Sequence, residues 1–193
     1  MASLLFAGCG PDIKLAGPLS SREHLDAKVE QPIALHVSAA ARLYEATGWI
    51  WVVPYRVEFG DSLEANAVDA FAQSFAKAEA VDHFPPTGPK APRLALDVEI
   101  AGSDVSPGWL TILSSSASVD LRGRLSIDGV VLPGPPIAVR GEATDSPGPL
   151  GAMPGANSGA YDQALQSACE DAMGDALDKL VDATIARIAS TAP

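Results

Sequence analysis

Basic residues, aromatic residues and cysteines are all scarce in this sequence. Its 193 residues include 13 Lys and Arg against 24 Asp and Glu, which gives a formal net charge of −11. Because nucleic-acid binding needs clustered Lys and Arg to meet the phosphates, this balance excludes a nucleic-acid partner. It equally argues against adsorption of the chain to anionic lipid headgroups by charge alone.

Long hydrophobic runs are also absent. No run approaches the ~18 apolar residues that a membrane-spanning helix needs, so attachment to a membrane would require a covalent anchor. Hydrophobic residues nevertheless make up 47% of the chain, which is enough for a packed core at this length. The length fits one domain, with or without a flexible arm.

The two cysteines stand in different contexts. Cys9 ends the apolar run that begins at Leu4, whereas Cys169 lies in a strongly helical segment beside Ala168 and Ala172. A disulfide is the ordinary interpretation of two cysteines in an exported protein. The alanine-rich helical surroundings of Cys169 instead predict a buried free thiol.

Residues 6–9, Phe-Ala-Gly-Cys, resemble the lipobox of bacterial lipoproteins, in which an apolar residue and two small residues precede a lipid-bearing cysteine. The resemblance implies that residues 1–8 are the remnant of a signal peptide and that Cys9 is acylated, with palmitate among its chains. No basic residue stands before Leu4, so this expectation depends on where translation starts. Gly10 after the cysteine, in place of aspartate, resembles sorting to the outer membrane.

The chain after the cysteine divides into two parts. Residues 9–30 are polar, contain Pro and Gly and show no clear period, which predicts a flexible tether between lipid and domain. Residues 31–190 contain all the periodic segments, and we expect them to form a single domain.

Alternation of apolar and polar residues predicts the strands of that domain. Pro54 marks an edge or a bulge, and Asp128-Gly129 is a strong signal for a tight turn. The predicted strands cover residues 32–39, 49–59, 94–100, 110–113, 118–127 and 137–140.

Two amphipathic helices complete the pattern. Asp61, with Glu64 three residues on, predicts the capped start of a helix of about five turns that runs to Ala78. A second helix is predicted from about Ala160 to Ile188, after a loop over 144–159 that is rich in Pro and Gly. The fold class is therefore α+β, with an antiparallel sheet of about four to five strands and both helices packed on one face.

Residues 60–63, Gly-Asp-Ser-Leu, match the nucleophile block of the GDSL (SGNH) hydrolases, between a predicted strand and a predicted helix. A serine nucleophile needs a base and oxyanion donors. That family takes them from an Asp-x-x-His block near the C-terminus and a Gly-x-Asn-Asp block, and neither is present, since the histidines are His24, His36 and His83. We expect that the chain is not an enzyme, with an esterase that uses Ser62 as the alternative.

The remaining polar groups predict no chemistry. The histidines are far apart and no Cys-x-x-Cys pairing exists, so neither a metal site nor a cofactor is expected. Asp97 and Glu99 share one strand face, which we interpret as the solvated face of a sheet rather than an acid–base pair.

Three arginines are candidates for contacting a ligand or partner. By alternation, Arg122, Arg124 and Arg140 point to the polar side of neighbouring strands, where they could meet an anionic glycolipid or an acidic partner. The alternative is cross-strand pairing with Asp120 and Glu142.

Aromatic residues form the second candidate group. Trp49 and Trp51, with Tyr55 and Tyr44 nearby, are of the kind that is enriched at interfaces. They are also ordinary residues of a core, and the sequence leaves both interpretations open.

The order of elements resembles small envelope lipoproteins, above all the LptE-type lipoproteins of lipopolysaccharide assembly and the YajG-type lipoproteins. These combine a lipid-bearing cysteine, an early strand, a helix, a β-meander and an alanine-rich C-terminal helix, and the resemblance spans most of residues 32–190. It implies a non-enzymatic accessory of envelope biogenesis, held in the outer membrane by Cys9 and facing the periplasm, that binds an envelope protein or a glycolipid. A soluble exported binding domain without lipid is the remaining alternative.

Overall fold

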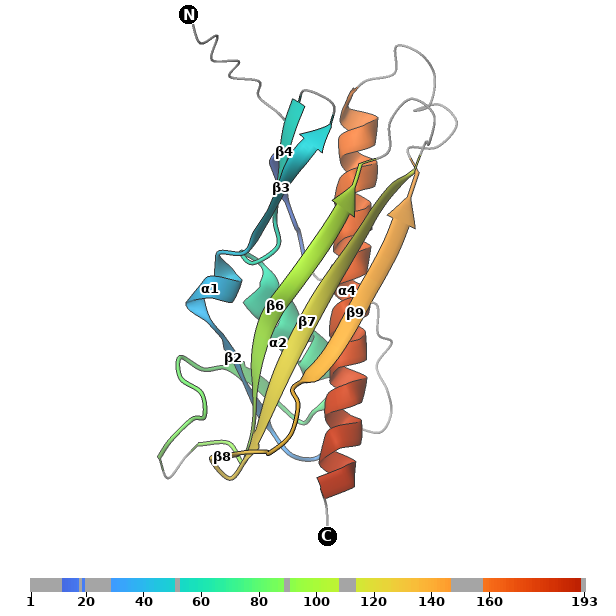
Figure 1. Cartoon of the computed structure of the whole chain (residues 1–193). Helices are drawn as coiled ribbons and strands as arrows, with labels where there is room; N and C mark the ends of the chain where they lie inside the picture. The colour runs from blue at the N-terminus through green and yellow to red at the C-terminus, as the bar shows by residue number, and fades with distance from the viewer. Residues whose placement is uncertain are drawn as a thin grey trace, which may run out of the picture.

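The computed structural model describes residues 12–17, 19, 29–50, 53–88, 91–107, 114–146 and 158–191. These residues form two β-sheets and three helices (Figure 1), so the chain is α+β as predicted. The strands are β1 (Asp12–Lys14), β2 (Ile33–Val37), β3 (Glu45–Ile50), β4 (Val53–Glu58), β5 (Ala78–Ala80), β6 (Leu94–Ser106), β7 (Ser115–Ile127), β8 (Val130–Val131) and β9 (Ile137–Asp145). The helices are α1 (Ala39–Arg42), α2 (Leu63–Ser74) and α4 (Ser158–Thr191).

The larger sheet has six strands in the order β5-β2-β6-β7-β8, with β9 paired to β7. The meander of β6, β7 and β9 is antiparallel as predicted, but β2 pairs parallel with both β5 and β6. The prediction of a purely antiparallel sheet of four to five strands is therefore wrong. Alternation identifies the buried side of a strand but not its neighbour, and here a long connection through α2 brings the chain back parallel to β2.

The smaller sheet has three strands in the order β1-β4-β3. The single strand predicted over 49–59 is instead an antiparallel pair, in which Trp49 of β3 lies opposite Pro54 of β4. On its other side β4 pairs with β1 only from Arg56 onward. β4 is thus the middle strand rather than the predicted edge, but Pro54, which has no backbone N–H, lies in the part of β4 that β1 does not reach.

The start of the predicted tether belongs to the folded domain. Ile13 and Leu15 are buried in the core. The backbone N–H of Ala16 donates to Glu170 Oε1 of α4 at 3.0 Å, and that of Leu19 donates to Asn66 Oδ1 of α2 at 3.0 Å. A strand of three residues has no detectable period, so the sequence pattern missed it; the rest of the predicted tether, apart from residues 29–30, lies outside the described residues.

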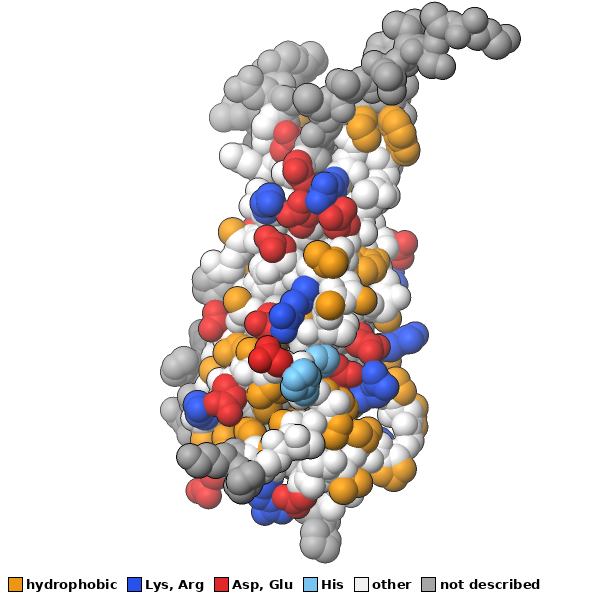
Figure 2. Space-filling view, turned by 90° about the vertical axis from the view of Figure 1, so that its left-hand side faces the viewer, with side chains coloured by type: hydrophobic (Ala, Val, Ile, Leu, Met, Phe, Trp, Pro, Cys, Tyr) orange, Lys and Arg blue, Asp and Glu red, His pale blue; other side chains and the backbone are white. Residues whose placement is uncertain are grey.

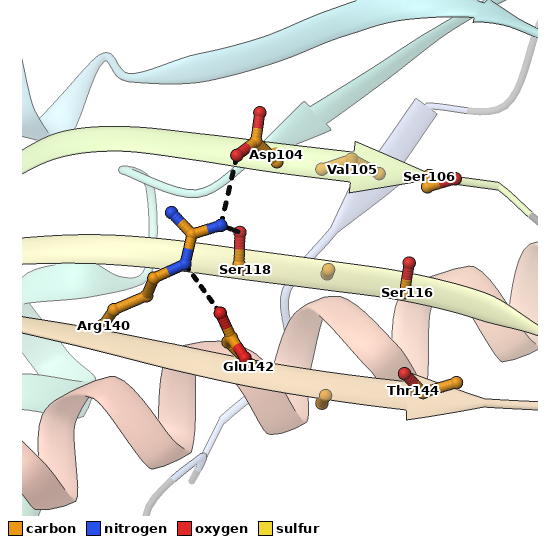
Figure 3. A pocket seen from close by; sticks show the side chains of 10 residues that line it. Asp104, Val105, Ser106, Ser116, Ser118, Arg140, Glu142 and Thr144 are labelled. Atoms are coloured by element: carbon orange, nitrogen blue, oxygen red, sulfur yellow. Dashed lines mark hydrogen bonds and ion pairs between the residues drawn. The ribbon is translucent and has the colours of Figure 1, made fainter.

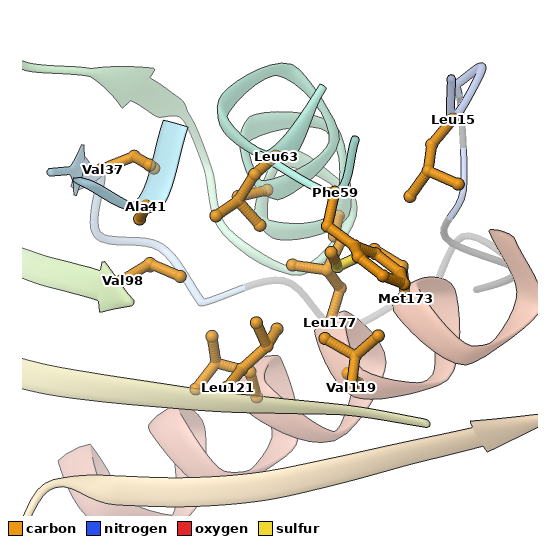
Figure 4. Packing of buried hydrophobic residues seen from close by; sticks show 14 of the residues in the cluster. Leu15, Val37, Ala41, Phe59, Leu63, Val98, Val119, Leu121, Met173 and Leu177 are labelled. Carbon is orange, nitrogen blue, oxygen red and sulfur yellow. The ribbon is translucent and has the colours of Figure 1, made fainter. Parts of the chain in front are cut away.

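Helix α4 covers the inner side of the larger sheet and packs closely on β9. A Cβ atom built on Gly141 of β9 would lie 2.0 Å from the carbonyl oxygen of Ala172, so only glycine fits where the helix crosses this strand. The predicted alanine-rich stripe of α4 thus allows backbone to approach backbone. Around this contact, apolar side chains of β7, α2 and α4 meet in one core, which includes Leu121, Leu63 and Leu177 (Figure 4).

Helix ends and turns follow the predictions in part. α4 lies within a few residues of its predicted bounds, and Asp128-Gly129 forms the predicted turn with φ values of 51° and 78°. α2 ends at Ser74, earlier than predicted, because Ala78–Ala80 pairs with β2 as β5. The cap predicted at Asp61 is wrong: Ser62 occupies the N-cap and makes no side-chain cap bond.

Two further predictions concern the state of the Cys169 thiol and the presence of a membrane-spanning helix. Cys169 is a free, buried thiol, as predicted. None of the helices within the described residues is both long and apolar enough to cross a bilayer.

The strand predicted over 110–113 and most of the loop predicted over 144–159 lie outside the described residues.

A candidate partner-binding face on the larger sheet

The outer side of the larger sheet presents a band of charged and hydroxyl side chains. Strands β6, β7 and β9 turn their apolar residues toward α4 and their polar residues away from it. We call this outer band the polar face. Its members are Asp97, Glu99, Asp104, Ser116, Ser118, Asp120, Arg122, Arg124, Arg140, Glu142 and Thr144.

A β-bulge in β6 places one of these residues. Ile100 lies opposite Leu121 of β7, but Gly102 lies opposite Asp120, so Ala101 is an extra residue in β6. Without the bulge, Asp104 would share the inward side of the strand with Ile100. The bulge reverses the alternation, as bulges do when they redirect a side chain, and Asp104 joins the polar face.

Arg140 of β9 is held by several groups on this face (Figure 3). Its guanidinium donates to Asp104 Oδ2 at 3.2 Å, Ser118 Oγ at 2.7 Å, Asp120 Oδ2 at 3.1 Å and Glu142 Oε1 at 2.8 Å. The hydrogen bonds to Glu142 and Asp104 raise the pKa of Arg140 above its ordinary value. The alternative of cross-strand pairing with Asp120 and Glu142 is thus what Arg140 adopts.

The sheet beside Arg140 is hollowed. An open hollow of about 460 Å³ lies over the ends of β6, β7 and β9. Its polar lining combines the charges around Arg140 with the hydroxyl groups of Ser106, Ser116 and Thr144 (Figure 3). Such a lining offers both hydrogen-bond donors and acceptors to a polar surface.

Arg124 belongs to a second cluster, built across three neighbouring strands. Asp97 of β6 accepts from His36 Nδ1 of β2 at 2.7 Å and from Arg124 Nη2 of β7 at 2.9 Å. The same Arg124 nitrogen also donates to Glu99 Oε1 at 3.0 Å. Each member therefore occupies a position fixed by strand register.

Asp97 is buried, with only 4% of its surface exposed, so its interpretation as a solvated residue was wrong. Strands β5 and β6 flank β2 on opposite sides, and the chain between them must cross back over β2. That crossing contributes Phe84, whose ring stacks on His36 with centroids 6.5 Å apart. The crossing segment thus covers one end of the outer side of the sheet.

The charge balance of the polar face is acidic despite its three arginines. Arg124 contacts two carboxylates and Arg140 contacts three. Arg122 is exposed and forms no ion pair or hydrogen bond with any residue in the described ranges. Two of the three arginines predicted to meet an anion are therefore already neutralised by the chain itself.

The free edge of β9 is closed by α4. The backbone N–H of Glu142 donates to Asp175 Oδ2 at 3.0 Å, and Lys179 Nζ donates to the carbonyl of Arg140 at 3.0 Å. Asp175 and Lys179 are themselves paired at 2.8 Å, one turn apart on the helix. Because the outward groups of this strand are occupied, addition of a further strand at these residues is blocked.

The aromatic candidates separate into core and surface. Tyr55 is buried and its hydroxyl donates to the carbonyl of Val105 at 3.0 Å, while the hydroxyls of Tyr44 and Ser103 lie 3.2 Å apart. Trp49 is 70% exposed. Trp51 lies outside the described residues, as does Cys9.

In the Gly-Asp-Ser-Leu segment, Gly60 has a packing role and Ser62 has a buried hydroxyl. Gly60 lies against α1, where a Cβ atom would come within 2.2 Å of the carbonyl oxygen of Ala41. The hydroxyl of Ser62 is buried and makes no hydrogen bond to any described residue. His36 lies on β2 of the larger sheet, where its Nδ1 and Asp97 Oδ1 are 2.7 Å apart.

Comparison with known proteins identifies the fold. No family model and no curated protein sequence matches the chain. Among solved structures it is similar to protein XCC0632 from Xanthomonas campestris, of the DUF330 family, with a TM-score of 0.51 and 9% identity over 92% of this chain and 98% of that chain. The two proteins therefore share a fold.

Two further solved structures are similar at lower TM-scores. One is a minor lipoprotein from Acinetobacter baumannii, with a TM-score of 0.48 and 8% identity over 83% of this chain and 95% of that chain. The other is the rare lipoprotein B from Shewanella oneidensis, with a TM-score of 0.48 and 8% identity over 82% of this chain and 97% of that chain.

Proposed function

We propose that the chain is a lipid-anchored protein of the bacterial envelope, which faces the periplasm from the outer membrane and acts by binding a protein partner rather than by catalysis. The observation that carries this proposal is the position of Cys9. The lipobox-like cysteine stands three residues before Asp12, the first residue of β1.

The N-terminal segment attaches that anchor firmly to the domain. Besides its pairing with β4, it is held by Glu170 and Asn66 and buries Ile13 and Leu15. A three-residue connection spans at most ~11 Å. An acyl group on Cys9 would thus hold the domain directly against the membrane surface, which suits an accessory to a membrane-embedded partner.

The polar face supports a protein as the partner in preference to a glycolipid. An anionic glycolipid would need several free arginines, but Arg124 and Arg140 are paired with carboxylates, which leaves Arg122 alone among the three. A mixture of paired charges and hydroxyls is the composition of the polar part of a protein–protein interface. The closed edge of β9 directs such a partner to the face of the sheet.

Mass spectrometry of the N-terminal peptide tests the anchor. The full chain, produced in a Gram-negative host, is expected to carry acyl chains on Cys9 and to fractionate with the outer membrane. A Cys9→Ser variant should lose both properties. An unmodified Cys9 would contradict the proposal and favour a soluble exported domain.

Photo-crosslinking in cells tests the partner. A photoreactive residue in place of Arg122 on the polar face is compared with one in place of Gln163, which is exposed on α4. A discrete protein adduct from position 122 alone is expected. An adduct with lipopolysaccharide would favour the glycolipid instead, and equal adducts from both positions would reject the polar face as the binding surface.

A further inference from the structure

We infer that the end of the domain formed by the β3–β4 hairpin contacts the bilayer surface through Trp49, beside the acylated Cys9. This inference rests on the proposed lipid anchor and adds an orientation to it. It assigns the exposed tryptophan to a lipid surface rather than to a protein.

Strand direction places the anchor at the hairpin end. β1 runs parallel to β4, with Asp12 opposite Arg56. Asp12, the first residue of β1, is therefore the end of that strand nearer to Val53, where β4 begins. Cys9 and Val53 are each three residues upstream of this pair. Since three residues span at most ~11 Å, the acyl group is confined to this end of the domain.

Trp49 stands at the same end and is one of the large hydrophobic residues that the fold leaves exposed. It lies on the edge strand β3, opposite Pro54, and 70% of its surface is exposed. The sequence from Trp49 to Val53 contains no charged residue. Tryptophan is enriched where a protein meets the headgroup region, because its ring is apolar and its N–H can still find a partner there.

A group of charged residues lies just behind the tryptophan, and we call it the charged collar. Arg56 pairs with Glu45 at 2.7 Å and with Glu58 at 2.9 Å, and Lys14 pairs with Glu58 at 3.0 Å. Thr47 is the residue opposite Arg56, so the collar begins two residues, or ~7 Å, from Trp49 along β3. Figure 2 shows acidic and basic side chains gathered in the upper part of this side of the molecule.

The collar limits how the end can sit on a membrane. Its charges pair with one another: the hydrogen bond with Lys14 lowers the pKa of Glu58, and the same bond raises the pKa of Lys14. Charged groups remain in water while an aromatic residue enters the interface, so the collar sets a shallow depth. Because Arg56 and Lys14 are paired with carboxylates and the net charge is −11, the chain gains nothing from anionic lipid, and the contact should not require it.

The opposite end of the domain provides a matched control. Figure 1 shows β8 and the C-terminus at the end away from the β3–β4 hairpin. Val130 of β8 is 66% exposed, much like Trp49. An apolar residue of similar exposure is thus available at each end, and only one lies near the anchor.

Depth-dependent fluorescence quenching tests the orientation. Single cysteines are introduced by Trp49→Cys and, in a second protein, by Val130→Cys, and each is labelled with the fluorophore NBD. Cys169 does not compete for the label, because burial raises its pKa to about 12, and acylated Cys9 has no free thiol. The full lipidated chains are reconstituted in phosphatidylcholine vesicles that contain brominated lipid.

The expected result is a blue shift and loss of emission for the probe at position 49, with no change at position 130 and no requirement for phosphatidylglycerol. Equal quenching at both positions, or stronger quenching at position 130, overturns the inference. Mass spectrometry of the same samples separates the two claims. Acylated Cys9 without preferential quenching at position 49 rejects the orientation alone, whereas unacylated Cys9 rejects the anchor and the orientation together.

Discussion

The two sides of the larger sheet are built from the same strands but are held by different forces. On the inner side, α4 crosses β9 so closely that Gly141 meets the backbone of Ala172. On the outer side, Arg140 is held by exposed carboxylates that could exchange their contacts with a partner. The inner side therefore fixes the shape of the domain by packing, whereas the outer side is held by ion pairs that are open to solvent.

Burial also differs between residues on the outer side of the sheet. Asp97 and Glu99 both accept from Arg124, yet Asp97 is buried beside His36, on which Phe84 of the crossing segment stacks, while Glu99 is half-exposed. Burial makes a hydrogen bond expensive to lose, because the remaining polar groups cannot turn to water. The bond from Arg124 to Asp97 therefore contributes to the stability of the fold, whereas the bond from Arg124 to Glu99 can be exchanged for water at little cost.

The largest effect is expected at the inner contact. Gly141→Leu places side-chain atoms inside the backbone of α4 and should destabilise the domain by about 3 kcal/mol or more. The measurement is the free energy of unfolding in urea. Gly159→Ala is the matched control, since no atom lies within 4 Å of a Cβ there, and it should leave stability within about 1 kcal/mol of the parent. Equal losses would show that α4 does not lie against β9 as described.

The next effect contrasts two acids that share one arginine. Asp97→Ala leaves His36 and Arg124 without their buried acceptor and should lower the free energy of unfolding by about 1.5–3 kcal/mol. Glu99→Ala removes only an exposed contact and should change it by less than about 1 kcal/mol. The same urea titration checks both variants. A larger loss for Glu99→Ala would mean that the segment after β5 does not cover this end of the sheet.

The third effect tests how well the inner side is closed to solvent. Burial raises the pKa of Cys169 from 9.0 to about 12, so the folded state keeps the thiol protonated while the unfolded chain ionises. Stability should therefore be fully present below pH 9 and fall as the pH rises toward 12, by about 1 kcal/mol at pH 10. In a Cys9→Ser background, Cys169 should resist thiol reagents until urea unfolds the protein. Rapid modification of the folded protein would contradict this closure.

The smallest effect on stability is expected for Arg140→Ala. Its three carboxylate partners are open to solvent, so the urea midpoint should move less than it does for Asp97→Ala. The hollow beside it, however, would keep its carboxylates and lose its positive charge. Crosslinking from position 122 should then weaken although the fold persists, whereas an unchanged adduct would place the partner elsewhere on the sheet.

Much of the fold could be predicted from local pattern. Alternation gave the cores of β2, β6, β7 and β9, and the positive φ values at Asp128-Gly129 follow from the residues that tolerate them. What pattern missed were pairings between distant segments. β1 is too short to show a period. The apolar run over 49–59 contains no residue pattern that marks the turn between β3 and β4. Alternation in β2 also does not show that both of its neighbours, β5 and β6, are parallel to it.

The side of the sheet on which the arginines lie could be predicted from the sequence, but their surroundings could not. Alternation correctly placed Arg124 and Arg140 on the outer side. It assigned Asp104 to no site, because the bulge at Ala101 that turns this residue outward is a property of the paired strands. Nor could it show that Asp97 is buried, since alternation does not reveal that the β5–β6 connection crosses β2 or that His36 and Arg124 pack beside this carboxylate.

The sequence by itself determined which residues could be buried, where the long C-terminal helix runs, and that a lipobox-like cysteine precedes the domain. These properties depend on neighbours along the chain. Only the tertiary structure decided that Arg124 and Arg140 are neutralised, that Asp97 is enclosed, and that β1 pairs with the hairpin bearing Trp49. Such facts arise from contacts between segments tens of residues apart, which folding alone brings together.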